Sequence, residues 1–440
     1  FHGTAMLAPG TGKTIFSFRI AYRMLELGLL KKGDIIVYNA ETVTREKVLF
    51  NEDPENPGEI HKFKSLYGKD ILQDFDFRFH CYQAKPDQIY NNFEKVGLVI
   101  NDEVHDMLTE TRHTILTKTK CPYNICLTGA MGMELNVFPS RIPADTSGRI
   151  SQSQIATDTK QVTDFITKGQ MLEAFAPVFM KYTTAEAIKD GVIADFRTYI
   201  IKHKLDNTIR NQLIWKSKNK WGTEQQFWDQ KYGFAAGPNS WTKPAFVTKA
   251  VLHNSLPNLL YSALSKDVVV QAILKRLEGQ KTIVFGQRIN TLQRILGKDR
   301  VITSKNESKL TDQFNKGEIL VIGSSKLLQQ GSNLNGVQNI IFHSYDSHYY
   351  LWQQRRARVR WLEGDQAKLF FIVTTDTFED DRKKYRNIKR VKDGKEVVEV
   401  KEVIQKGWYS KMKEERDEKG KLIKIHDFNV VATISSSTLV

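Results

Sequence analysis

The sequence predicts an α/β protein with two parallel-sheet lobes in tandem, an insert in the second lobe and a basic C-terminal extension. Two observations support this prediction. Short apolar runs typical of buried strands alternate with segments of helical periodicity, as in a parallel sheet with crossover helices. The alternation stops once, in a stretch rich in Ser, Thr and Gln, and then resumes. The 440 residues are enough for two or three domains, each with its own core.

The first lobe is expected to span residues 1–145. Its expected strands are 4–8, 35–38, 77–82, 96–100 and 124–128, and its first helix is 14–27. The pattern breaks after Met133, where Pro139, Pro143 and a polar stretch follow. Residues 146–190 are therefore expected to form a linker or crossing to the second lobe.

The second lobe is expected to span residues 191–380. Its expected strands are 196–201, 282–285, 319–323, 339–343 and 369–373, with a helix at 268–277. A tryptophan-rich insert at about 204–260 places Trp215, Trp221, Trp228 and Trp241 among lysines. These rings either stack on the bases of a single strand or, as we favour, pack the insert against the lobe.

Residues 381–440 are expected to form a charged and mainly basic C-terminal extension. Within it, Lys392-Asp393-Gly394-Lys395 predicts a hairpin turn. The strongly basic stretch 383–390 either binds a nucleic-acid backbone or forms a solvated face.

The composition restricts the partners of the chain. Its 65 Lys and Arg residues outnumber 50 Asp and Glu residues, and the net charge of +15 favours association with nucleic acid over a role in solubility alone. No apolar run approaches the ~18 residues of a membrane span, so no membrane partner is expected. Three cysteines exclude a disulfide scaffold and predict an intracellular, cytoplasmic protein. No signal peptide is visible, and the chain opens at Phe1 rather than Met, which leaves open that residues precede it.

A glycine-rich turn separates the first expected strand from the first helix. Its glycines let the backbone curl so that successive N–H groups point at phosphates, and the helix N-terminus adds positive charge. Lys13 can reach the outer phosphates, and the Thr14 hydroxyl suits a Mg²⁺ ion that bridges two of them. Leu7 stands where the stricter pattern has glycine or alanine, and a purely structural turn is the alternative. The expected site for ATP and Mg²⁺ consists of Pro9, Gly10, Thr11, Gly12, Lys13 and Thr14.

An acidic pair follows the buried run 96–100. A carboxylate at the tip of such a strand is where a magnesium-bound nucleotide needs one, and Asp102 can hold the metal, through water. Glu103 is then placed to orient and deprotonate the attacking water. Chemistry alone assigns no role to His105. An isolated Asp-Glu pair would be a solvated loop, but its combination with the phosphate loop favours the functional interpretation.

The phosphate loop and Asp102-Glu103-Val104-His105 together resemble the motifs of a DExH-box motor of helicase superfamily 2. The resemblance runs from about residue 4 to residue 373. It implies two RecA-like lobes that clamp ATP between them and nucleic acid across them, with His105 among the nucleotide-binding residues. The chain is similar to compact phage or viral helicases, which implies host cytoplasm and a role in replication or recombination. Residues 324–358 are similar to Swi/Snf-type translocases.

Three further segments resemble motifs of this family. Asn39-Ala40-Glu41-Thr42 lies where the family contacts the nucleic-acid backbone, which implies that role for Thr42. Leu127-Thr128-Gly129-Ala130 resembles the Ser/Thr-Ala-Thr motif that links the two binding sites, and departs from it at its last two residues. Residues 281–288 look like the first strand and loop of the second lobe, which implies nucleic-acid contacts from Gln287 and Arg288.

Residues 324–334 resemble motif V of the family. The resemblance implies that the hydroxyls of Ser324 and Ser325 hold a sugar–phosphate backbone. It also implies that Gly331 and Asn333 approach the nucleotide.

Residues 352–360 resemble motif VI, whose two arginines emerge on one helix face and stabilise transition-state charge on the γ-phosphate. Two registers are open. In the first, Arg355 and Arg358 have the spacing of three residues, but Leu351 occupies the usual glutamine position. In the second, Gln354 is the glutamine and a tryptophan stands at the second arginine. Arg358 belongs to both registers, and a solvated basic helix is the alternative.

We therefore expect an ATP-hydrolysing motor that moves along or unwinds nucleic acid, DNA in preference to RNA. The alternatives are a translocase that tracks duplex without separating strands, an RNA helicase, and a nucleic-acid-binding structural protein with a silent nucleotide site. Intact Lys13, Asp102 and Glu103 argue against the last of these. The sequence leaves polarity, pathway, protein partners and oligomeric state open.

Overall fold

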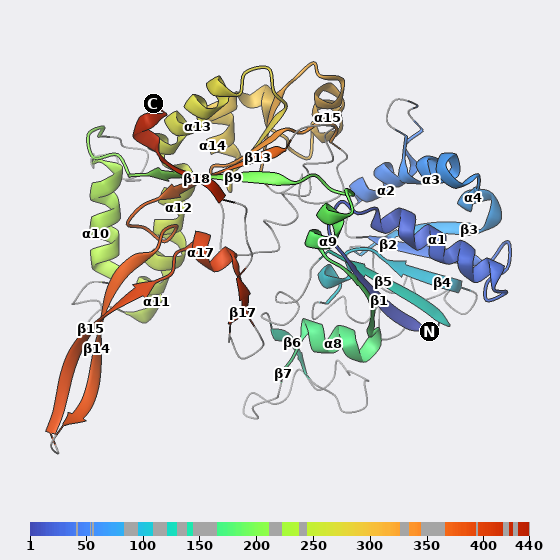
Figure 1. Cartoon of the computed structure of the whole chain (residues 1–440), viewed down its shortest axis with the longest axis horizontal. Coiled ribbons are helices and arrows are strands. Elements are labelled where there is room, and N and C mark those ends of the chain that lie inside the picture. The colour runs from blue at the N-terminus through green and yellow to red at the C-terminus, as the bar shows by residue number, and fades with distance from the viewer. Residues whose placement is uncertain are drawn as a thin grey trace. The chain divides into compact units, whose positions relative to one another are not determined.

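A computed structural model of the chain shows two compact units (Figure 1). The first consists mostly of Phe1–Ala194, and the second of Asp195–Leu328, Leu334–Glu414 and His426–Val440. The structure describes residues 1–40, 43–52, 54, 57–82, 96–108, 121–129, 139–143, 165–210, 222–236, 244–325, 334–344, 366–392, 395–416, 422–425 and 430–439.

The first unit is built on a six-stranded sheet in the order β3-β2-β4-β5-β1-β8. Its strand pairs are all parallel, as the sequence predicts. The strands are β1 (His2–Leu7), β2 (Ile35–Ala40), β3 (Asp76–Cys81), β4 (Val96–Asn101), β5 (Tyr123–Thr128) and β8 (Val178–Tyr182). β1, β2, β4 and β5 are buried along most of their length, and this burial explains their nearly continuous apolar runs.

One face of this sheet is covered by α1 (Lys13–Glu26), α2 (Val43–Phe50), α3 (Glu59–Tyr67) and α4 (Ile71–Asp74). In α1, Phe18, Ala21 and Tyr22 recur at helical spacing and face the sheet. The Phe63 ring of α3 meets the Phe18 ring edge-on, with ring centroids 5.6 Å apart. This core fixes the start of α1, and with it the glycine-rich turn, against the end of β1.

Residues 165–190, which we expected within the crossing, instead contribute elements to the first unit. They form β7 (Phe165–Thr167), α8 (Lys168–Phe175), β8 and α9 (Thr184–Lys189), and β7 pairs with β6 (Pro139–Pro143). β8 joins the sheet beside β1. It is an edge strand with mostly exposed side chains, so it lacks the apolar run that marks the buried strands.

The second unit also contains a six-stranded parallel sheet, in the order β11-β10-β12-β13-β9-β18. Its strands are β9 (Phe196–His203), β10 (Thr282–Phe285), β11 (Val321–Ser324), β12 (Asn339–Phe342), β13 (Ala367–Thr374) and β18 (Val430–Ser435). α13 (Leu264–Arg276) and α14 (Ile289–Leu296) pack on one face. On the other face three phenylalanine rings stack in sequence and meet Tyr409 of α17 (Trp408–Met412). The C-terminal extension thus supplies both a sheet strand and a covering helix.

The insert of the second lobe is helical where it is described. It forms α10 (Glu224–Ala236), α11 (Ala245–Ala250), the π-helical segment η5 (Val251–Ser255) and α12 (Leu256–Ser262). Trp228 is buried in this cluster, stacks on Tyr232 and meets Phe378 edge-on at 5.1 Å between ring centroids. For Trp228 the packing interpretation is confirmed, whereas the other three tryptophans lie outside the described residues.

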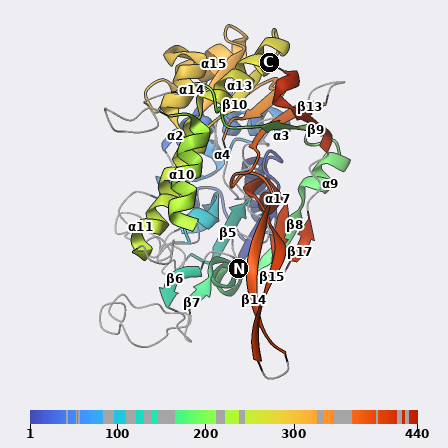
Figure 2. The same cartoon turned by 90° about the vertical axis from the view of Figure 1, so that its left-hand side faces the viewer.

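The C-terminal extension begins with a long antiparallel hairpin of β14 (Arg382–Lys392) and β15 (Lys395–Gln405). Lys392 pairs with Lys395, which confirms the predicted turn. The hairpin extends away from the second sheet in two perpendicular views (Figures 1 and 2). The remaining short elements are η2 (Val104–Asp106), η6 (Lys298–Arg300), α15 (Glu307–Lys316), β16 (Glu414–Arg416), β17 (Leu422–Ile425) and η8 (Ser436–Thr438).

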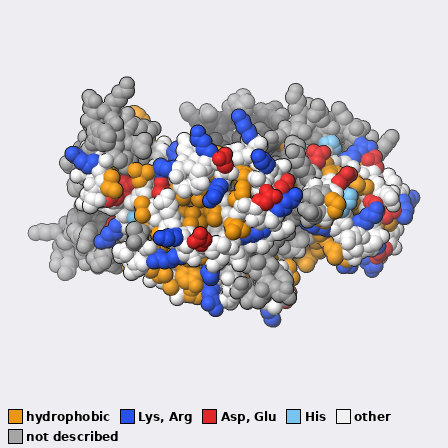
Figure 3. Space-filling model, turned by 90° about the horizontal axis from the view of Figure 1, so that it is seen from above, with side chains coloured by type: hydrophobic (Ala, Val, Ile, Leu, Met, Phe, Trp, Pro, Cys, Tyr) orange, Lys and Arg blue, Asp and Glu red, His pale blue; other side chains and the backbone are white. Residues whose placement is uncertain are grey.

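Basic side chains are spread over the face of the molecule that Figure 3 shows, with acidic and apolar side chains between them. Within the described part of the chain, no helix is both long enough and apolar enough to cross a membrane.

Candidate nucleotide site

The expected nucleotide-binding residues of the first lobe lie at one edge of its sheet. Because the strands are parallel, the ends of β1, β2, β4 and β5 meet there, and each end carries one of the polar segments singled out in the sequence. The glycine-rich turn connects β1 to α1, and the acidic pair follows β4.

The turn has the backbone shape that a phosphate loop needs. Gly10 and Gly12 have φ angles of 89° and 80°, in the left-handed region that glycine adopts at little cost. Gly12 caps α1 and has no side chain that could accept the N–H groups of the first helical turn, so a bound anion suits them. Thr11 closes the loop by donating from its hydroxyl to the carbonyl of Ala8 at 2.6 Å.

Lys13 and Glu103 form an ion pair with 2.5 Å between Nζ and Oε1. The other carboxylate oxygen of Glu103 accepts from the backbone N–H of Gly129 at 3.2 Å and lies 3.5 Å from His105 Nδ1. Burial alone would raise the pKa of Glu103, but the charges of Lys13 and His105 and the hydrogen bonds from Lys13 and Gly129 outweigh it and lower the pKa to about 2. Glu103 is therefore an ionised carboxylate at neutral pH.

The backbone of Glu103 is itself unusual. Its φ angle is 48°, a left-handed conformation that residues with a side chain rarely adopt. Such conformations cost free energy and cluster at functional sites. Here the turn aims the carboxylate at Lys13 and at the end of β5.

Thr14 and Asp102 provide oxygen donors of the kind that Mg²⁺ prefers. Their side chains are buried, with 2% and 4% of each residue exposed. The Tyr38 hydroxyl donates to Asp102 Oδ2 at 2.9 Å and lies 3.5 Å from the Thr14 hydroxyl. Burial, and then the nearby Glu103, raise the pKa of Asp102 against the opposing charges of Arg45 and Lys13. The donor set fits a magnesium ion.

Arg45 of α2 and Glu59 of α3 were not expected at this site. Arg45 donates from Nε to Asp102 Oδ2 at 3.0 Å and from Nη2 to the Thr14 hydroxyl. Glu59 accepts from the same guanidinium at 2.9 Å. Neither residue belongs to a motif that the sequence analysis singled out, and a charged residue is ordinary in a helix.

Buried amides align the strand ends beneath the site. Asn39 donates to Asn101 at 2.9 Å, and Asn101 donates to Asn124 at 2.6 Å, which links β2, β4 and β5. The Tyr82 hydroxyl donates to the carbonyl of Asp102. His105 Nδ1 lies 3.0 Å from the Thr128 hydroxyl, which connects the acidic segment to the end of β5. One buried asparagine thus recurs in each of these three strands.

In the second lobe, the described candidates lie at the corresponding edge of the sheet. Gln287 and Arg288 follow β10, and Ser324 and Ser325 lie at the end of the neighbouring β11. Gln287 donates from its backbone N–H to the Ser344 hydroxyl at 2.8 Å. Arg288 donates to the Asn258 side chain. The other candidates, Thr42, Gly331, Asn333, Arg355 and Arg358, lie outside the described residues.

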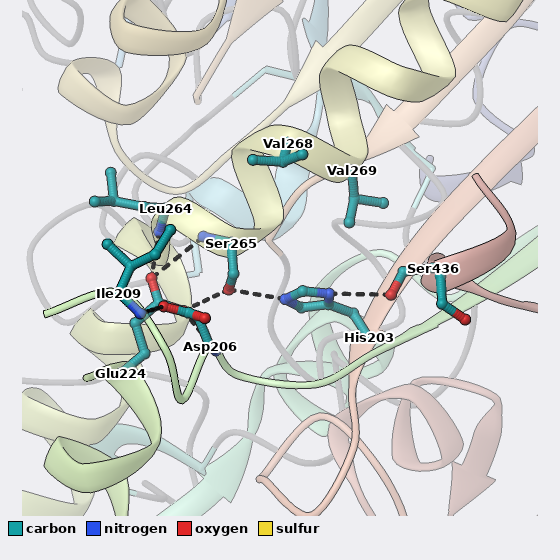
Figure 4. A pocket seen from close by; sticks show the side chains of 10 residues that line it. His203, Asp206, Ile209, Glu224, Leu264, Ser265, Val268, Val269 and Ser436 are labelled. Carbon is teal, nitrogen blue, oxygen red and sulfur yellow. Dashed lines mark hydrogen bonds between the residues drawn. The ribbon is translucent and has the colours of Figure 1, made fainter. Parts of the chain in front are cut away.

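A separate cavity of about 320 Å³ lies in the second lobe, and its mainly apolar lining includes a few hydrogen-bonded polar side chains (Figure 4). His203, at the end of β9, lies between the hydroxyls of Ser265 at 2.8 Å and Ser436 at 3.3 Å. Glu224 accepts from the Ser265 hydroxyl and from the backbone N–H of Leu264 at 2.6 Å, so it caps α13. Burial, and then the charges of Lys266 and His343, lower the pKa of His203 to about 4. This histidine is neutral at pH 7 and holds the strand end, helix and C-terminal segment together.

A buried ion pair also stabilises this lobe. Lys266 Nζ lies 2.6 and 2.7 Å from the two carboxylate oxygens of Glu379, and neither side chain is exposed. Removal of one partner from such a pair typically costs about 3–5 kcal/mol because the other charge stays buried. The pair joins α13 to the loop after β13.

Among the comparisons with known proteins, the match to a family model lies in the second lobe. Residues 265–361 match the family described as the helicase conserved C-terminal domain. No curated protein matches the chain.

Three solved structures are similar in fold. The ATP-dependent Type ISP restriction-modification enzyme LlaBIII bound to DNA is 14% identical with a TM-score of 0.51 over 86% of this chain, which spans only 27% of that enzyme. The Hef helicase domain of Pyrococcus furiosus is 13% identical, with a TM-score of 0.45 and 86% and 93% of the two chains covered. Dbp5 of S. cerevisiae, bound to RNA and ADP BeF3, is 10% identical, with a TM-score of 0.45 and coverage of 85% and 80%. The two sheets are those of tandem RecA-like lobes.

Proposed function

We propose that the protein is a nucleic-acid-dependent ATPase of helicase superfamily 2, of the DExH-box type, which couples ATP hydrolysis to movement along DNA. The observation that carries this proposal is the gathering of Lys13, Thr14, Asp102 and Glu103 at one edge of a parallel sheet. It occurs in a chain whose second lobe matches the helicase C-terminal domain.

In the proposed reaction, the first lobe binds and hydrolyses ATP. The backbone N–H groups of the loop around Gly10 and Gly12, together with Lys13, bind the phosphates. Thr14 and Asp102 hold Mg²⁺, which neutralises phosphate charge when bound. Glu103 accepts the proton of the attacking water. When Lys13 turns to the phosphates it leaves Glu103, which makes the carboxylate more basic at the moment that a base is needed.

The second lobe is proposed to grip the nucleic acid and to complete catalysis. Gln287, Arg288, Ser324 and Ser325 contact the sugar–phosphate backbone, and Thr42 of the first lobe does the same. Arg358, with Arg355 in the first of the two registers, stabilises charge on the γ-phosphate. Gly331 and Asn333 approach the nucleotide, as does His105. The resemblance of these segments to the family motifs supports the assignments.

DNA is the partner that we propose first, and RNA is the alternative. The positive net charge favours a polyanion of either kind. We further propose the compact phage or viral type, acting in replication or recombination in the host cytoplasm. A translocase that tracks duplex without separating strands is the second candidate within the same class.

One experiment tests the class and the partner together. ATP hydrolysis is measured without nucleic acid and with single-stranded DNA, duplex DNA or RNA, and strand displacement is followed on DNA and RNA forks. Stimulated hydrolysis with displacement on DNA supports the proposal. Stimulation by duplex without displacement identifies the translocase. The absence of hydrolysis under every condition overturns the assignment as a motor.

A further inference from the structure

Arg45 lies among three acceptors from three different elements. Its Nε donates to Asp102 Oδ2 at 3.0 Å, and its Nη2 donates to the Thr14 hydroxyl. On the outer side, Nη2 and Nη1 lie 2.9 and 3.4 Å from the two carboxylate oxygens of Glu59. Only 15% of the Arg45 side chain and 6% of the Asp102 side chain are exposed. The planar, forked guanidinium is the group that can serve all three acceptors at once.

Two of these acceptors are the groups proposed to hold Mg²⁺. A magnesium ion binds oxygen at about 2.0–2.1 Å and requires their lone pairs. A guanidinium that donates to the same oxygens takes up those lone pairs, and its charge repels the metal. Arg45 therefore competes for the Thr14 hydroxyl and for Asp102 Oδ2 with Mg²⁺ and with the water through which Asp102 would hold the metal.

A cation at this position has a clear use before the metal arrives. Asp102 is buried, and a buried carboxylate without a counterion is strongly destabilising. Arg45 supplies that counterion within the lobe. Glu59 is more exposed than Asp102 and offers the guanidinium a second partner towards the solvent.

We propose that Arg45 is an internal counterion that holds the metal position of the phosphate-loop site in the nucleotide-free state and withdraws towards Glu59 when Mg²⁺ binds. This inference rests on the proposed function, since it concerns the same site. In this proposal Arg45 competes with the metal for its ligands. Glu59 weakens that competition because it offers the guanidinium another partner.

Substitution of Arg45 should therefore have effects of opposite sign with and without metal. In Arg45→Gln we expect a non-hydrolysable ATP analogue to bind about tenfold more tightly with Mg²⁺, because the competitor is gone. With EDTA we expect binding to weaken about tenfold, because Arg45 no longer offsets phosphate charge near Asp102. Titration of a fluorescent form of the analogue under the two conditions measures both changes.

Two further variants sharpen the test. Arg45→Lys keeps the charge and should lie closer to the wild type than Arg45→Gln in both conditions. Glu59→Gln removes the outer partner, so Arg45 stays on Asp102 and the analogue should require more Mg²⁺ for binding. Arg23→Gln breaks an exposed ion pair with Glu26 in the same lobe and serves as the matched control without effect. If Arg45→Gln does not fold, Glu59→Gln decides the question, because an unchanged Mg²⁺ requirement in that variant would overturn the inference.

The inference and the proposed function fail in different ways. Weaker binding of the analogue to Arg45→Gln by the same factor with Mg²⁺ and with EDTA would show that Arg45 supports Asp102 in the loaded state, which overturns the inference. No binding of nucleotide to the wild-type chain would overturn the proposed function. In that event Mg²⁺ alone remains the probe: Arg45→Gln should gain thermal stability from Mg²⁺ and the wild type should not, and equal gains would overturn the inference.

Discussion

At the scale of single residues, Glu103 combines three properties that rarely occur together. Its backbone is left-handed, its carboxylate is paired with Lys13 at 2.5 Å, and its pKa is lowered to about 2 although burial works in the other direction. An ion pair with a lysine of the phosphate loop is one that a bound phosphate can break. In the proposed reaction, Lys13 would keep Glu103 ionised until it turns to the phosphates of the nucleotide.

Glu103→Gln should preserve the binding of ATP and stop its hydrolysis. The amide keeps the shape and can still accept from Lys13 and Gly129, but it cannot take a proton from water. A measurement of nucleotide affinity beside single-turnover hydrolysis separates the two steps. Parallel losses of affinity and turnover would instead make Glu103 a ligand or a structural residue.

At the scale of secondary-structure elements, the strands that are buried on both faces gave the clearest signal, and β3 was predicted by alternation although it is an edge strand. β1, β2, β4 and β5 are buried on both faces and read as apolar runs, whereas the edge strands β8 and β18 are partly exposed and gave no such signal. The residues of the candidate site likewise fall into those that the sequence predicts and those that it does not. Lys13, Thr14, Asp102 and Glu103 stand in continuous motifs next to strand ends. Arg45 stands in a short helix where a charged residue is ordinary, and only the packing of α2 reveals its partners.

The anchoring of α13 by His203 predicts a dependence of stability on pH. The pKa of His203 falls from 6.5 to about 4 on folding, chiefly through burial. Below pH 6.5 the unfolded chain takes up a proton that the folded chain refuses until about pH 4, so the free energy of unfolding decreases as the pH falls across this window. The full contribution is roughly 3 kcal/mol.

Urea unfolding at a series of pH values measures this effect. In His203→Gln the amide keeps a polar partner for the serines but does not titrate, so the decrease between pH 6.5 and 4 should be smaller than in the wild type. Part of it remains, because burial lowers the pKa of His343 as well. An unchanged slope in the variant would remove His203 as its source.

At the scale of the whole molecule, two features bear on the proposed function: the net charge and the division into two lobes. A net charge of +15 over the chain suits binding to nucleic acid through the phosphate backbone, which does not depend on the base sequence. The described candidates in the second lobe, Gln287, Arg288, Ser324 and Ser325, lie at the ends of two adjacent strands. In the proposed function, long-range attraction by the net charge and local contacts from these four residues would contribute separately to the affinity for nucleic acid.

Affinity for nucleic acid should be independent of sequence and should fall steeply as salt rises. Each phosphate that a basic residue neutralises adds about 0.9 to the slope of log affinity against log salt for duplex DNA. Arg288→Gln should lower that slope by about one unit on any sequence. Titrations at several salt concentrations test this prediction, and a strong preference for one sequence would contradict it.

Arg358→Ala should lower turnover at saturating nucleic acid by about 10³-fold or more if this arginine acts on the γ-phosphate, while binding of ATP to the first lobe is retained. Stimulation by nucleic acid should disappear with it. Near-normal turnover at saturating DNA or RNA, together with weaker binding, would make Arg358 a backbone contact instead.

The pairing of β18 with β9 has a consequence for how the chain acquires its structure during synthesis. The sheet of the first lobe is complete once the ribosome has made β8, so that lobe is able to fold while translation continues. The second sheet receives its last strand from residues 430–435, after every other strand of that sheet has been made. Until then the edge of β9 is open and available to other chains. A ribosome that stops early should therefore release a protein with a folded first lobe and an aggregation-prone second lobe.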